Sequence, residues 1–189
     1  MNPHLDKHDA LIIVDMQNDF CPGGALPVQD CDSVVITLNR WIECASQAGA
    51  KVIASRDWHP PDHSSFQGQG GKWPRHCMQE TPGAQFRPDL HLPPDVLVVS
   101  KGTQPDRDSY SVFEDTVLAE ELQNEGIIRL WIGGVALEVC VRATALDSLR
   151  AGFEVHLIRA GTSPVDKVAG RRALREMEQA GIIIETEHY

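Results

Sequence analysis

The sequence lacks three features that would assign it to a special class of protein. It has no apolar run near the ~20 residues of a membrane helix, and residues 1–9 lack the apolar core of a signal peptide. No basic cluster offsets its formal net charge of -10, which disfavours a nucleic acid or an anionic membrane as partner. We therefore expect a cytoplasmic protein that contacts neither membranes nor nucleic acids.

Cysteines are few and widely spaced. Their number, five, is odd and no CxxC pair occurs, so a disulfide scaffold is not indicated. We expect most of them to be reduced thiols: Cys21, Cys31, Cys44, Cys77 and Cys140. The 189 residues, 42% of them hydrophobic, suffice for one well-buried domain and are few for two. Residues 1–189 are therefore predicted to form a single domain.

Apolar runs alternate with helical periodicity along the chain. The continuous apolar run 10–15 is typical of a strand buried on both faces of a parallel sheet, whereas 34–45 repeats apolar residues at helical spacing. We assign Asp32 as the N-cap of that helix and Gly49 as its end. The predicted strands are 10–15, 51–55, 96–99, 128–132, 153–158 and 182–185; the predicted helices are 34–45, 112–124, one beginning near 140, and 167–180. This order predicts a three-layer α/β/α sandwich around a six-stranded, mainly parallel sheet.

Reactive side chains stand at or just beyond the carboxyl ends of several predicted strands. Asp15 ends the first strand, Lys101 ends the third, and Cys140 lies where the fourth leads through Gly133-Gly134 into a helix. The carboxyl ends of parallel strands meet at one edge of the sheet, where α/β proteins bind ligands. Each residue alone has an ordinary structural explanation, but their joint placement at one edge favours an active site.

These residue types suit nucleophilic catalysis by a thiol. The positive end of the helix dipole and the ammonium of Lys101 are expected to lower the pKa of Cys140 and favour the thiolate. Asp15 is the carboxylate that would take the thiol proton. Because glycines let the backbone approach a substrate closely, the N–H groups of Ala136 and Cys140 are candidates for an oxyanion hole.

A second group of candidate residues lies in the long, mostly aperiodic segment 57–94. A loop of that length inside a compact domain is usually functional. Asp57 and His59 can face one side of an extended segment, and His76 would complete a site for one divalent ion, Zn²⁺, Fe²⁺ or Mn²⁺. His63 is a candidate fourth ligand or outer partner. From spacing alone, the alternative is a polar loop whose histidines bind no metal.

Several motifs together resemble the nicotinamidases of the isochorismatase-like hydrolase superfamily, over nearly the whole chain. The matching stretches are Ile12 to Phe20, Asp57-Trp58-His59, Trp73-Pro74 with His76-Cys77, Thr81 to Ala84, Ser100-Lys101-Gly102, Tyr110 to Phe113, Gly134-Val135-Ala136 and Cys140 to Asp147. The metal segment narrows the resemblance to the nicotinamidases, because many sister enzymes lack it.

The resemblance implies a role for each group of residues. It implies a catalytic triad of Asp15, Lys101 and Cys140, metal ligands Asp57, His59 and His76, and pocket walls Phe20, Trp73 and Tyr110 for a nicotinamide ring. It also implies a cis peptide bond between Val135 and Ala136. The implied activity is hydrolysis of nicotinamide to nicotinate and ammonia through a thioester on the cysteine, a reaction of NAD salvage. The metal would contact the pyridine nitrogen and position this small-molecule amide. A homo-oligomer is compatible with the sequence.

The chain departs from the family pattern at two places. Leu137-Glu138-Val139 precedes the nucleophile where the family often has Thr-Asp-Tyr, and Arg159-Ala160 stands where Asp-Ala is common. These departures concern the pocket rim or an oligomer contact and leave the triad intact. The alternative within the superfamily is an amidase for another small amide or carbamoyl compound; isochorismatase activity is disfavoured because it needs no thiol. Outside the hydrolases, the alternative is a non-catalytic metal or redox sensor with Cys140 as its oxidisable switch.

Overall fold

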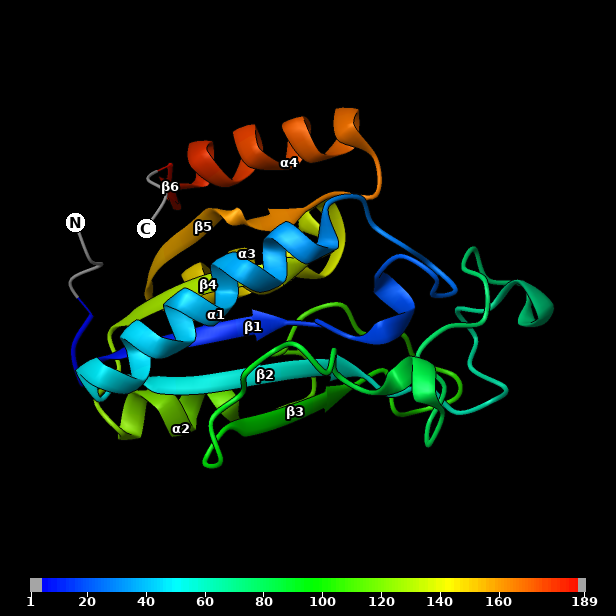
Figure 1. Cartoon of the computed structure of the whole chain (residues 1–189), viewed down its shortest axis with the longest axis horizontal. Helices are drawn as coiled ribbons and strands as arrows, with labels where there is room; N and C mark the ends of the chain where they lie inside the picture. Colours follow the sequence, from blue (N-terminus) through cyan, green and yellow to red (C-terminus); the bar gives the residue numbers. More distant parts are fainter. Residues whose placement is uncertain (1–4, 187–189) are drawn as a thin grey trace.

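One sheet organises the molecule (Figure 1). Its six strands are β1 (Asp9–Val14), β2 (Lys51–Asp57), β3 (Leu97–Lys101), β4 (Arg129–Val135), β5 (Glu154–Ser163) and β6 (Ile183–Glu185). They lie in the order β3-β2-β1-β4-β5-β6, and every neighbouring pair is parallel. The structure, a computed structural model, describes residues 5–186. The predicted six-stranded parallel sheet is confirmed.

Strand β1 lies in the middle of the sheet because it is apolar on both faces. All six of its residues are buried. Leu11 and Ile13 belong to one hydrophobic cluster, and Ala10, Ile12 and Val14 belong to the other. This alternation follows from the two-residue period of a strand, so a single strand contributes to both cores.

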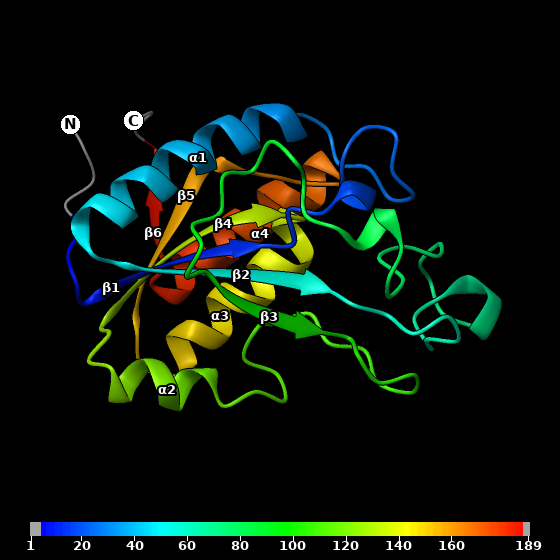
Figure 2. The same cartoon turned by 60° about the horizontal axis from the view of Figure 1, so that its bottom comes forward.

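Helices cover both faces of the sheet (Figures 1 and 2). Helix α1 (Cys31–Ala48) packs on the face of Leu11 and Ile13. Helices α2 (Leu118–Asn124), α3 (Arg142–Arg150) and α4 (Lys167–Ala180) contribute their buried residues to the other cluster. The predicted three-layer α/β/α arrangement is confirmed. Within residues 5–186, no helix combines the length and the apolar character needed to cross a bilayer.

The strand order places a topological switch in the centre of the sheet. From β1 the chain adds β2 and β3 on one side, and it then returns to add β4 on the other side of β1. Crossovers that diverge in this way leave a crevice at the carboxyl ends of the two central strands, where ligands bind. The ends of β1 and β4 are therefore the place to look for a site.

Two predicted helix starts were wrong. Helix α1 begins directly after Asp30, so Asp32 lies in its first turn and is not its N-cap, whereas Gly49 ends the helix as predicted. Helix α2 begins at Leu118, six residues later than the predicted 112. The reason lies in Asp115, whose backbone is left-handed (φ 57°) and therefore interrupts a right-handed helix.

A disulfide joins Cys21 and Cys31. The other three cysteines are free, which agrees with the expectation that most are thiols. The pairing itself was not predicted. The loop after Phe20 turns back on α1 and brings the two Cα atoms within 5.5 Å of each other, a proximity that sequence spacing alone does not reveal.

A buried ion pair fixes the amino-terminal end of the sheet. Asp9, at the start of β1, is fully buried. It accepts hydrogen bonds from Arg129 Nε (2.6 Å), from Arg129 Nη2 (2.9 Å) and from Trp131 Nε1 (3.1 Å). Burial acts to raise the pKa of Asp9, but these hydrogen bonds and the Arg129 charge outweigh it and lower the pKa.

We predict that Asp9→Asn lowers the free energy of unfolding by about 1–3 kcal/mol, because a charge-assisted hydrogen-bond network is lost. Since the folded-state pKa is depressed, this contribution is present at neutral pH and disappears as the pH falls below about 4. Chemical denaturation of both proteins between pH 2 and 7 checks this. Glu125→Gln, which breaks the exposed pair with Lys51 (2.6 Å), is the control, with an expected loss of at most about 1 kcal/mol. Equal losses in the two variants would contradict the prediction.

Candidate active site

The carboxyl ends of four neighbouring strands bring ionisable side chains together. Asp15 follows β1, Asp57 ends β2, Lys101 ends β3 and Cys140 lies shortly after β4. Asp57 and Lys101 are direct partners in the sheet register. All four side chains are buried, and Lys101 is only 3% exposed. The sequence had assigned three of them to catalysis and one to a metal; in the structure they form one cluster.

Lys101 lies at the centre of this cluster. Its Nζ is 2.7 Å from Asp15 Oδ2 and 3.3 Å from Cys140 Sγ, and it donates a hydrogen bond to Asp57 Oδ1. The other oxygen of Asp15 accepts a hydrogen bond from the Ser55 hydroxyl (2.7 Å). Asp15 Oδ2 is buried beside the Lys101 ammonium, and the carboxylate lies within 4.8 Å of the sulfur. It is therefore available to accept the thiol proton.

The protonation states follow from burial and from this charge pattern. Burial raises the pKa of Asp15. The Lys101 ammonium acts to lower this pKa, and the Asp57 carboxylate acts to raise it further. Burial acts in the same direction on Asp57, but Lys101 and His59 hold the pKa of that carboxyl far below its usual range. For Lys101, burial lowers the pKa, but the two carboxylates outweigh burial and raise it, so the ammonium persists.

The expectation of a thiolate at Cys140 was wrong for this structure. Burial raises the pKa of the thiol well above its usual value, and the Lys101 ammonium only partly opposes this because Asp15 and Asp57 add to the rise. The thiol is therefore the resting form, and a base must remove its proton when it reacts.

Asp57, His59 and His76 face one another beside the thiol. Asp57 Oδ2 is 3.5 Å from His59 Nε2 and 3.8 Å from His76 Nε2. The Nδ1 atoms of the two rings bond to backbone carbonyls, His59 to Gly102 (2.9 Å) and His76 to Pro74 (2.7 Å). Such outer bonds fix the ring tautomer and turn Nε2 toward a common point, as in metal sites.

The donor set fits a divalent cation. One oxygen and two nitrogens lie within 4.8 Å of one another and are buried. The two carboxylates of the cluster and the Lys101 ammonium leave one net negative charge there, which a divalent ion would offset. Burial lowers the pKa of His76, whereas in His59 the Asp57 carboxylate outweighs burial and raises the pKa. Asp57, His59 and His76 are thus the residues that would hold a metal.

His63 does not face this point. Its Nδ1 bonds to the Ser65 hydroxyl (2.7 Å) and its Nε2 to the Arg107 carbonyl (3.1 Å), so both ring nitrogens are engaged. The ring packs against His59 in a tilted arrangement, with centroids 4.2 Å apart. In this structure His63 supports a metal-site histidine and offers no ligand atom of its own.

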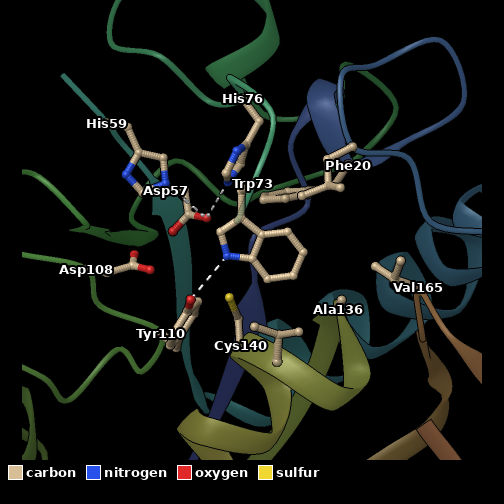
Figure 3. A pocket seen from close by; sticks show the side chains of 12 residues that line it. Phe20, Asp57, His59, Trp73, His76, Asp108, Tyr110, Ala136, Cys140 and Val165 are labelled. Carbon is tan, nitrogen blue, oxygen red and sulfur yellow. Dashed lines mark hydrogen bonds and ion pairs between the residues drawn. The ribbon is translucent and has the colours of Figure 1, made fainter. Parts of the chain in front are cut away.

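An aromatic pocket opens above the cluster (Figure 3). Phe20, Trp73 and Tyr110 line it, as do Cys140 and the two histidines of the metal group. Trp73 Nε1 donates to the Tyr110 hydroxyl (3.1 Å), which fixes the two rings relative to each other. Figure 3 shows the Cys140 sulfur on one side of this space and the Asp57–His59–His76 group on another. A flat ring with a polar substituent fits such a space.

The backbone before Cys140 also lines the pocket. The peptide bond between Val135 and Ala136 is cis, as the resemblance implied. The chain then forms a π-helical turn, Leu137–Val141, that leads into α3. Ala136 and Val139 line the pocket with Cys140. Glu138, one of the three residues here that depart from the family pattern, accepts hydrogen bonds from the backbone of the β5–α4 loop, including Asp166 N (2.7 Å).

Three residues of the site had no role in the sequence prediction. Gln17 is buried and clamps Asp57 by accepting from its N–H (2.8 Å) and donating to its carbonyl (2.7 Å). Ser55 orients Asp15. Asp108 lines the pocket beside Tyr110 (Figure 3). The sequence offered one signal for these three residues, which is the position of Gln17 in the motif at the end of the first strand. Ser55 and Asp108 reach the site from other segments of the chain.

Comparisons with known proteins give the family of this chain. Residues 9–188 match the isochorismatase domain family. The nicotinamidase of Escherichia coli K12 is 40% identical over 200 aligned positions that cover 94% of each chain. The solved structure of a Pyrococcus horikoshii pyrazinamidase in complex with zinc superposes with a TM-score of 0.92, at 49% identity over 95% of this chain and 99% of the other.

A third relative is a Leishmania infantum protein, PnC1, whose structure was solved in complex with nicotinate. It has a TM-score of 0.86 and 37% identity, and the match covers 95% of this chain and 92% of that one. These relatives agree with the resemblance drawn from the motifs. The chain belongs to the isochorismatase family, and its nicotinamidase relatives confirm that it is a hydrolase of the predicted class.

Proposed function

We propose that this protein is a metal-dependent amidohydrolase that converts nicotinamide to nicotinate and ammonia. The observation that carries the proposal is the position of the Cys140 thiol. It lies 3.3 Å from a buried ammonium, within 4.8 Å of a carboxylate, and in an aromatic pocket that also contains a candidate metal site. That combination suits a ring amide: a nucleophile and base for the amide carbon, and a separate anchor for the ring.

The proposed reaction begins with proton transfer from the Cys140 thiol to Asp15, and the sulfur attacks the amide carbon. The backbone N–H groups of Ala136 and Cys140 stabilise the tetrahedral oxyanion. Asp15 then gives its proton to the nitrogen, ammonia leaves and a thioester remains. Asp15 next takes a proton from water, and the resulting hydroxide attacks the thioester. Asp15 returns this proton to the departing sulfur, which restores the thiol, and nicotinic acid leaves as nicotinate after losing a proton to water. Throughout, Lys101 holds its proton and balances the negative charge of the sulfur and carboxylate.

Asp57, His59 and His76 would hold one divalent ion, Zn²⁺, Fe²⁺ or Mn²⁺. When bound, the ion supplies a Lewis-acid contact for the pyridine nitrogen. Zinc in the pyrazinamidase relative supports this assignment. Phe20, Trp73 and Tyr110 enclose the ring, which limits water in the pocket and orients the amide toward the sulfur.

Another small amide is the alternative substrate. A carbamoyl compound needs the thiol and its base but no anchor for a ring nitrogen, so the metal group favours nicotinamide. The single domain over residues 1–189, the role in NAD salvage, the cytoplasmic location and a homo-oligomer stay predictions. Residues 1–4 and 187–189 of that domain lie outside the described part of the chain.

We predict that Cys140→Ala lowers kcat for nicotinamide by roughly 10⁴-fold or more, because the nucleophile is removed. Binding of nicotinamide should persist, since the metal group and the aromatic walls are intact. A coupled ammonia assay with nicotinamide, pyrazinamide and a carbamoyl compound measures turnover, and calorimetry measures binding. Cys44→Ala, which alters a free thiol outside the pocket, should keep full activity. Ammonia release by Cys140→Ala would exclude the mechanism, and a preference for the carbamoyl compound would exclude the substrate.

Removal of the metal with a chelator is predicted to abolish nicotinamide turnover, and added Zn²⁺, Mn²⁺ or Fe²⁺ should restore it. His76→Ala should weaken metal binding by more than about 100-fold, because it removes a direct ligand. Elemental analysis of the purified variant measures the metal content. The exposed His91, changed to Ala, is the matched control. A chelated protein that retains full activity would refute the assigned role of the metal.

The raised pKa of Asp15 predicts the acid side of the pH profile. Because the carboxylate must be unprotonated to act as base, kcat/KM should fall as the pH drops through a pKa above the usual value of about 4. Asp15→Asn should lose turnover at every pH. Steady-state rates from pH 4 to 8 check this. Asp15→Glu, measured at constant metal content, should shift this acid limb. An unchanged acid limb would argue against this carboxylate as the base.

A further inference from the structure

A second cleft lies on the other side of the π-helical turn from the aromatic pocket. Its walls come from the start of α1, from Leu137, from the β5–α4 loop and from the first turns of α4. Its cavity volume is about 300 Å³. This size falls in the range of small-molecule sites, which is roughly 300–1,000 Å³. The proposed amidase reaction uses none of its polar residues.

Three cationic side chains line this cleft: Arg159, Lys167 and Arg171. None of them forms an ion pair or a side-chain hydrogen bond with another residue in the part of the chain that the structure describes. Asp30 is the one acidic side chain among the lining residues, so the cleft carries a net positive charge in a protein whose formal net charge is -10. Unpaired cations concentrated around one concavity attract an anion.

Neutral donors complete the cleft. Ser163 is 4% exposed and lines it, and its hydroxyl has no hydrogen-bond partner among residues 5–186. This hydroxyl is therefore free to donate a hydrogen bond to a ligand or to water in the cleft. Helix α1 begins at the same wall, with Gln29, Asp30 and Ser33 in the lining. The amino-terminal end of that helix, 18 residues long, adds a partial positive charge.

We propose that this cleft binds a phosphate-type anion, either free inorganic phosphate or the phosphoryl group of a phosphorylated metabolite. Guanidinium forks, an ammonium and a hydroxyl together match the tetrahedral oxygens of phosphate. A planar carboxylate would satisfy fewer of these donors. Arg159, which departs from the family pattern, thereby acquires a role at the β5 side of the cleft.

The cleft is joined to the active site by a short connection. The Glu138 carboxylate, in the turn that carries Cys140, accepts hydrogen bonds from Val165 N (3.3 Å) and Asp166 N (2.7 Å). Val165 lines the aromatic pocket, and Lys167, two residues further on, lines the cleft. An anion that orders the β5–α4 loop would therefore also order one wall of the aromatic pocket.

Calorimetric titration of the metal-loaded protein with inorganic phosphate, and separately with the nucleoside diphosphate ADP, tests the proposal. Arg171→Glu should weaken phosphate binding by about tenfold or more, because it replaces an attractive charge with a repulsive one. Arg172→Glu is the matched control, since it makes the same charge change on the next residue of α4, which does not line the cleft. Its affinity should stay within about twofold of the unchanged protein. Ser163→Ala should also weaken binding, without any change of charge.

Each outcome has a definite meaning. Equal weakening by Arg171→Glu and Arg172→Glu would show general surface electrostatics and overturn the proposal, as would the absence of binding. Phosphate affinity that disappears in the metal-site variant His76→Ala would place the anion on the metal and likewise overturn it. ADP that binds more tightly than phosphate, with both lost in Arg171→Glu, supports the site and identifies a phosphorylated metabolite; equal affinities support it with free phosphate. None of these readings depends on amide turnover, so the amidase function is tested separately.

Discussion

The buried ammonium of Lys101 is the constraint on which the rest of the site depends. A charge that is removed from water costs several kcal/mol unless it is paired closely. Lys101 meets this condition with two carboxylates, Asp15 at 2.7 Å and Asp57 on the neighbouring strand. These contacts fix the ends of β1, β2 and β3 relative to one another. The thiol of Cys140 lies beside them, 3.3 Å from the ammonium and within 4.8 Å of the Asp15 carboxylate.

Asp57 links the two halves of the site. One of its oxygens bonds to Lys101, and the other faces the nitrogens of His59 and His76. A change in charge near His59 and His76 therefore alters the electrostatic potential at Lys101 and at the thiol, which lies 3.3 Å from the ammonium. The same arrangement explains why the thiol stays protonated at rest. Burial, with the two carboxylates, outweighs the ammonium, so a thiol acting as nucleophile needs a base such as Asp15.

The long β2–β3 segment shows what holds an irregular chain in a defined position. Its metal-site histidines bond to backbone carbonyls, and Gln17 clamps Asp57 by two hydrogen bonds. Gly102 follows Lys101 with a left-handed backbone (φ 59°), and a Cβ there would come within 2.4 Å of the His59 ring. Only glycine allows the carbonyl of that residue to reach His59 Nδ1. Much of this precision comes from single contacts between segments far apart in sequence.

The sequence by itself determined the layers, the parallel sheet and the edge at which Asp15, Lys101 and Cys140 gather. Apolar periodicity and strand ends are local properties, and parallel strands bring their ends together wherever the chain leads between them. Tertiary structure alone decided the disulfide between Cys21 and Cys31, the raised pKa of the thiol and the turning of His63 away from the metal group. These properties depend on distances and on burial, and residues that are remote in the chain set both. No pattern among neighbouring residues in the sequence encodes them.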